Sequence, residues 1–152
     1  MCTSAFKSDQ KRLVLWVADC IEHVLALFKE KHPHGNRPQK AIEACRAWVV
    51  TGVFKMTLIR RVLFDFHAAA RQAKDKLVCF ATRAAGHAVA ISHVPTHSIG
   101  TSIYAIKAGA AKTGNQSDGL ATEHEWQLQR LSEYAKIESY KQFLLWCFFI
   151  FF

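Results

Sequence analysis

Histidine is the residue type whose number and position in this chain could support chemistry. The chain has eight histidines. Four of them lie in an alanine-rich central stretch that also holds two arginines: His67, His87, His93 and His97, with Arg71 and Arg83. A helical zinc site needs two histidines four residues apart on one continuous helix, together with a third ligand. His93 and His97 have this spacing, but Pro95 lies between them and breaks the helical face. We therefore interpret these histidines as structural, each hydrogen-bonded to a carboxylate or a carbonyl, and expect no metal or other cofactor.

Charged residues in apolar surroundings are a second set that could position helices. Those with apolar neighbours are Arg37, Glu43, Arg46, Arg71 and Arg83, and the acid Asp19 in a mainly apolar segment. Buried charges are rarely tolerated unless paired, so Asp19 or Glu43 with one of the arginines would form an inner ion pair. We favour Arg37 and Glu43 as inner residues over Arg46. The alternative is that these charges form a solvated face.

The patterns of the common enzyme classes are missing. The sequence has no G-x-S-x-G elbow, P-loop, H-E-x-x-H pair or glycine-rich nucleotide fingerprint, and Asp65 and Asp75 are isolated acids. Its five cysteines are odd in number, scattered and never in a C-x-x-C pair, which argues against a disulfide framework or a zinc knuckle. Cys20 and Cys45 have apolar neighbours and should be inert core thiols. We therefore expect a protein that is not an enzyme, with no catalytic, cofactor-binding or metal-binding residues.

The elements that must position these residues are helices. Apolar residues recur at helical spacing in six segments, with turn residues between them. We expect the first helix over 8–31 with Ser8 as N-cap, the second from Asn36 or Arg37 to a stop at Gly52, and the third over 57–74 with Thr57 as cap. The fourth is expected over 76–94, where Pro95 ends it, and the fifth over 98–112. A flexible loop at 113–119 then precedes the sixth helix, which is expected from Thr122 onward. Small residues in 81–90 would let a neighbouring helix approach closely. The predicted fold is all-α, a single-domain antiparallel bundle of about six helices.

Composition agrees with a globular chain. Of 152 residues, 51% are hydrophobic and 21% charged, and no secretory signal is evident, so we expect a cytoplasmic protein. The net charge of +8 would attract nucleic acid, anionic lipid or an acidic protein surface. The basic residues are spread over the whole chain, which makes the nucleic-acid indication weak.

An aromatic C-terminal tail follows the helical domain, which we place at 1–142. The tail, 143–152, contains Phe143, Trp146 and Phe152 and is too short to span a membrane. We expect it to pack as a terminal helix or strand. The alternative is an end that binds a membrane surface or aggregates.

Three groups of residues, in this order along the chain, resemble a known family. They are Asn36 to Ala44, Phe66 to Arg71 and Ala84 to Ala90, accompanied by His93, His97, Tyr104 to Ala108 and Glu125 to Gln127. Together, over about Leu13 to Leu131, they resemble the putative immunity proteins of bacterial polymorphic toxin systems. The family's pattern often has aspartate before the arginine of the first group, where this chain has Asn36, which can still cap a helix. The aromatic tail is not a feature of the family.

The resemblance implies an all-helical domain that binds and neutralises a cognate bacterial toxin without catalysis. The implied partner is a toxin protein that is occluded by the bound chain, and no small-molecule substrate is expected. The residues that match the family's motifs are implied to be structural: Arg37, Pro38, Lys40, Glu43, His67, Arg71, Arg83, His87, His93, His97 and Trp126. Two other functions remain open from the residues alone, a basic nucleic-acid-associated accessory protein and a histidine-based metalloprotein.

Overall fold

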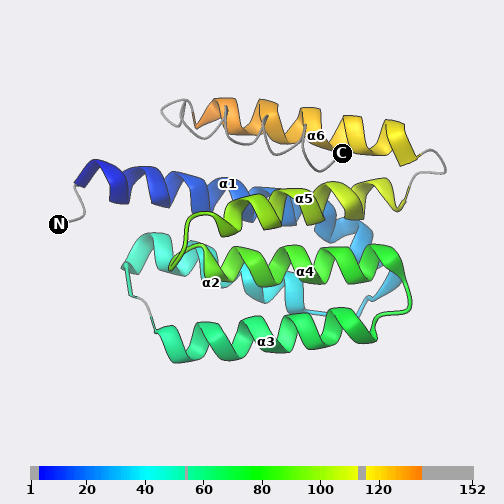
Figure 1. Cartoon of the computed structure of the whole chain (residues 1–152), viewed down its shortest axis with the longest axis horizontal. Helices are drawn as coiled ribbons and strands as arrows, with labels where there is room; N and C mark the ends of the chain where they lie inside the picture. The colour runs from blue at the N-terminus through cyan, green and yellow to red at the C-terminus, as the bar shows by residue number, and fades with distance from the viewer. Residues whose placement is uncertain (1–3, 54, 113–115, 135–152) are drawn as a thin grey trace.

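Six α-helices make up the computed structural model, which describes residues 4–53, 55–112 and 116–134 (Figure 1). They are α1 (Ser4–Lys31), α2 (Arg37–Thr51), α3 (Met56–Gln72), α4 (Lys76–Ala90), α5 (His97–Ala110) and α6 (Gln116–Glu133), with no strand in the described ranges. The predicted all-α bundle of about six helices is therefore confirmed. The boundary at residue 142 and the packing of the tail 143–152 lie outside the described residues.

The helices are arranged around α4, which packs against α5 on one side and against α3 on the other (Figure 1). Helix α1 packs against α2, α4 and α5, and α6 lies at one outer edge, mainly against α5. Helix α3 forms the opposite edge and packs mainly against α4. Helices α2 and α3 both contact α4 but make few contacts with each other, which leaves space between them.

The core combines large apolar side chains of α1 with small side chains of α4. Among the largest fully buried side chains, Trp16 and Ile21 come from α1. Small buried residues predominate over 81–90, as the sequence predicts. A Cβ added at Gly86 would lie 3.0 Å from Phe66 Cβ, so the missing side chain lets α3 lie close to α4.

Local signals explain several helix ends. The Asp75 carboxylate caps α4 by accepting hydrogen bonds from the backbone N–H groups of Leu77 at 2.8 Å and Val78 at 3.3 Å. Helix α2 has Pro38 in its first turn and ends at Gly52, whose φ of 65° is left-handed and whose N–H bonds to the Trp48 carbonyl at 2.8 Å. Asn36 occupies the N-cap of α2 as predicted, but its side chain makes no capping hydrogen bond.

Other predicted boundaries are wrong. Helix α1 begins at Ser4, not at Ser8, and the carboxylate of Asp9 pairs with Arg12 one turn later, which suits a helix interior. Helix α3 has Lys55 as N-cap in place of Thr57, because the Ile59 N–H already bonds to the Lys55 carbonyl at 3.1 Å.

The later boundaries differ in the same way. Helix α3 ends at Gln72, α4 ends at Ala90 before a short turn, and α5 spans His97–Ala110 rather than 98–112. Helix α6 begins at Gln116, within the predicted loop and six residues before Thr122. Its first turn carries the helix-stabilising acid Asp118 and Gly119 is buried, so packing outweighs the loop-forming composition. None of the helices in the described ranges combines the length and apolar character that crossing a bilayer requires.

Candidate functional site

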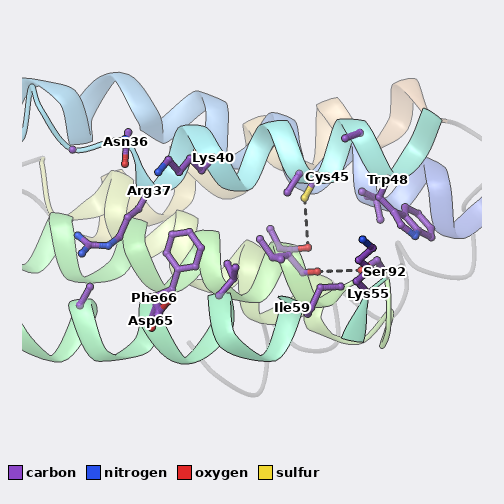
Figure 2. Close-up of a pocket in the computed structure, with 18 of the residues that line it drawn as sticks. Asn36, Arg37, Lys40, Cys45, Trp48, Lys55, Ile59, Asp65, Phe66 and Ser92 are labelled. Atoms are coloured by element: carbon purple, nitrogen blue, oxygen red, sulfur yellow. Dashed lines mark hydrogen bonds between the residues drawn. The ribbon is translucent and has the colours of Figure 1, made fainter. Parts of the chain in front are cut away.

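A groove of about 950 Å³ runs between α2 and α3, and we call it the α2–α3 groove. Its floor and walls are mostly apolar, and Figure 2 shows Phe66 rising from α3 toward α2. Arg37 lies at one end, and Trp48 and Lys55 lie at the other (Figure 2). The groove exists because both helices rest on α4 without packing on each other.

The three sequence groups that carry the family resemblance meet at this groove. The first contributes Arg37 and Lys40, the second contributes Phe66, and the third contributes Ala88 and Val89 on α4. These groups are separated along the chain, so only the fold brings them to one surface. The groove is not among the features predicted from the sequence.

The charges around the α2–α3 groove are mostly positive. Arg37, Lys40 and Lys55 line it together with one acid, Asp65, and all four side chains are exposed. Pro38 is buried in the first turn of α2.

The groove wall contains one cysteine thiol. Cys45 is buried, and burial raises the pKa of its thiol to about 12. Its Sγ donates to the Ala88 carbonyl at 3.5 Å (Figure 2). Burial likewise raises the pKa of Cys20 well above its usual value, and both thiols lie in the core, as predicted.

A second polar cluster brings three of the predicted histidines together on α3, α4 and α5. Nδ1 of His87 lies 3.0 Å from Nδ1 of His97, so one imidazole donates and the other accepts. The ring of His67 meets His87 edge-on with centroids 5.3 Å apart, and Tyr104 stacks on His87 at 5.5 Å. A Cβ at Gly100 would lie 2.6 Å from His87 Nδ1, so a larger residue at this position would clash with the His87 ring. We call His67, His87 and His97 the imidazole cluster.

Positive groups surround the imidazole cluster. Arg83 donates from Nη1 to the Tyr104 hydroxyl at 3.1 Å, and Lys107 lies 5.9 Å from the centroid of the same ring. Burial, and then the neighbouring His97, His67 and Arg83, lowers the pKa of His87 to about 4. Burial is also the main cause that lowers the pKa of His67 and of His97. The three rings are therefore neutral near pH 7.

The partners of these histidines differ from the prediction. We expected carboxylates or carbonyls, but His87 and His97 bond to each other. His93 lies outside this contact and is exposed in the turn after α4, while Arg71 is exposed and acts on His67 through its charge. In the part of the chain that the structure describes, no group of three histidine, cysteine or acidic side chains is arranged to hold a metal.

Replacing His87 with alanine should lower the free energy of unfolding by about 1–3 kcal/mol, because His97 loses its partner. His67→Ala should cost less, since the ring of His67 makes an edge contact with His87. Urea denaturation of the two variants measures both effects. One equivalent of zinc bound to the unaltered protein and lost in either variant would overturn this structural role.

Of the two acids predicted for an inner ion pair, Asp19 is held inside, whereas the preference for Arg37 and Glu43 is wrong. Arg37 and Glu43 are both exposed, and Glu43 accepts a hydrogen bond from Gln39 on the same helix. The acid held inside is Asp19, whose side chain is 13% exposed. It binds Arg130 Nε at 2.8 Å, accepts from the Tyr134 hydroxyl at 2.7 Å and lies 3.8 Å from Arg46 Nη2.

A buried polar group joins α6 to α1 and α5. Glu123 is 5% exposed and bonds to His23 Nδ1 at 2.9 Å, and Trp126 stacks on the His23 ring with centroids 3.8 Å apart. The amide of Gln127 accepts from the Ser102 hydroxyl at 2.5 Å and donates to Glu123 at 3.3 Å. Neither Glu123 nor Gln127 is among the residues predicted from the sequence. Their spacing with Leu131 at i, i+4 and i+8 places all three on one helix face and could have shown them.

The comparisons with known proteins agree with the resemblance seen in the sequence. A family model described as Imm-5 like putative immunity protein matches residues 4–134 of the chain. The comparisons with curated proteins and with solved structures gave no match. The matched range holds all six helices, the α2–α3 groove and the imidazole cluster, and it extends beyond both ends of the predicted range 13–131. The chain therefore belongs to the Imm-5 like putative immunity protein family.

Proposed function

We propose that this chain is the immunity partner of a bacterial toxin and neutralises it in the cytoplasm by non-catalytic binding. Membership of an immunity-protein family supports the role. The observation that carries the proposal is the α2–α3 groove, an apolar hollow with a basic edge. Concave apolar surfaces with a few polar groups at their edges are typical of binding sites.

The groove suits binding better than chemistry. Its cysteine is a buried thiol whose pKa is raised to about 12, and its acid, Asp65, is exposed in a groove that is lined by basic residues as well. An effective nucleophile needs a lowered pKa or an adjacent base. These properties support occlusion of a toxin surface as the mode of action.

The test is survival of bacteria that produce a candidate toxin domain, chosen from the genes next to the one that encodes this chain. Co-expression of this chain should restore growth by several orders of magnitude in colony count. Ala44 is an exposed residue of α2 that lines the groove, so Ala44→Trp should fill the groove and remove most of the protection.

The matched control is Ala121→Trp, which enlarges an exposed alanine on α6 at the opposite edge of the bundle. This variant should protect as well as the unaltered chain. Absence of protection by the unaltered chain would overturn the immunity role. Equal protection by the two tryptophan variants would instead show that the toxin binds another surface.

A further inference from the structure

We propose that the segment of the toxin received by the α2–α3 groove is an amphipathic α-helix with an apolar stripe and acidic flanks. This inference rests on the function proposed above and adds the chemistry and the secondary structure of the bound segment. It follows from the charges at the groove, from the chemistry of its walls and from its length.

The charges select an acidic partner. Arg37, Lys40 and Lys55 outnumber Asp65 along the groove, and all are exposed to an incoming segment. Between Arg37 at one end and Lys55 at the other lie apolar side chains such as Phe66 and Ile59 (Figure 2). A segment that complements this arrangement carries apolar residues along its centre and carboxylates at its margins.

The helical walls of the groove favour a bound segment that is itself a helix and not an extended strand. Both walls are α-helices, whose backbone N–H and C=O groups are bonded within each helix, so they offer no free edge to a β-strand. A bound segment must therefore satisfy its own backbone hydrogen bonds while it buries apolar side chains. An α-helix does this, and laying an amphipathic helix in an apolar groove is a common mode of recognition.

The dimensions agree with a helix of about four turns. Helix α2 has 15 residues and is therefore about 22 Å long at a rise of 1.5 Å per residue. The groove follows it from Arg37 to Thr51. One of the lining residues at this end, Val53, is an exposed apolar side chain, since it is 63% exposed.

A second copy of this chain fits the groove less well. The chain carries a net charge of +8, so two copies repel each other, and a basic groove gains nothing from a basic partner. The charge of the groove and the charge of the chain thus both favour a different, acidic protein.

The experiment measures the affinity of the purified toxin domain for two variants that carry the same change in charge. The groove variant combines Arg37→Glu, Lys40→Glu and Lys55→Glu. The control variant combines Lys29→Glu, Lys74→Glu and Lys76→Glu, three exposed lysines that do not line the groove. We expect the groove variant to bind at least about 100-fold more weakly and the control variant to lose no more than about fivefold.

Hydrogen exchange of the toxin in the complex then identifies the bound segment. We expect protection of an acidic stretch with apolar residues at helical spacing, and lysines introduced at its acids should restore binding to the groove variant. Equal losses in the two variants, or protection of a basic or extended stretch, would overturn this inference. No binding to the unaltered chain would instead overturn the proposed function.

Discussion

Replacing Trp16 with alanine is expected to lower the free energy of unfolding by about 3–5 kcal/mol. The Trp16 side chain is fully buried in α1, and its Nε1 donates to the Gln127 carbonyl of α6 at 3.0 Å. The variant therefore leaves a large cavity and removes a buried hydrogen bond between α1 and α6. Denaturation in guanidinium chloride, followed by circular dichroism, measures the loss.

The matched control is Trp48→Ala, which removes the same side chain from a half-buried position at the groove. This change should cost about 1–2 kcal/mol, because less apolar area is lost and the site opens to solvent. Equal losses in the two variants would contradict the packing described for α1. The control variant should also bind the toxin more weakly, which Trp16→Ala would do only through unfolding.

Acidification is expected to destabilise the protein between about pH 6.5 and pH 4. The pKa of His87 is lowered to about 4 in the folded chain, first by burial and then by His97, His67 and Arg83. The unfolded chain binds a proton at His87 as the pH falls through 6.5, whereas the folded chain does so only near pH 4. The folded state therefore loses stability across this window, by about 2 kcal/mol from His87 after allowance for solvent screening.

His67 and His97 add to this loss, because burial lowers their pKa values as well. Glu123 acts in the opposite direction, since burial raises the pKa of its carboxyl and favours the protonated folded form. The free energy of unfolding should be measured by urea denaturation from pH 7 to pH 4. His87→Gln should flatten the profile, whereas His34→Gln, at an exposed ring, should leave it unchanged. A profile that is equally steep in both variants would show that the imidazole cluster is not the cause.

The helices could be predicted from the sequence where local chemistry dictates them. Pro38 suits the first turn of α2 because proline lacks the backbone N–H that a helix interior needs. Gly52 suits the end of α2 because glycine readily adopts the left-handed φ found there. The start of α6 could not be predicted in this way, because burial of Gly119 against the rest of the bundle outweighs its weak helical preference.

The candidate site could be predicted only in pieces. His67, His87 and His97 were identified as a group, but their contacts with one another depend on how α3, α4 and α5 pack. The partners of Asp19 include Arg130, which is 111 residues away, so spacing along the chain says nothing about the pair. The α2–α3 groove results from two helices that do not pack together, a property of the fold that no short motif encodes.

The most direct test of the immunity role is the heat of binding between this purified chain and the candidate toxin domain used in the survival test. Isothermal titration calorimetry should show a one-to-one complex with a Kd below about 1 µM. Ala44→Trp should weaken that complex strongly, and Ala121→Trp should leave it unchanged. No heat of binding to the toxin domain, together with tight binding of the chain to duplex nucleic acid, would contradict the account and favour the nucleic-acid-associated role.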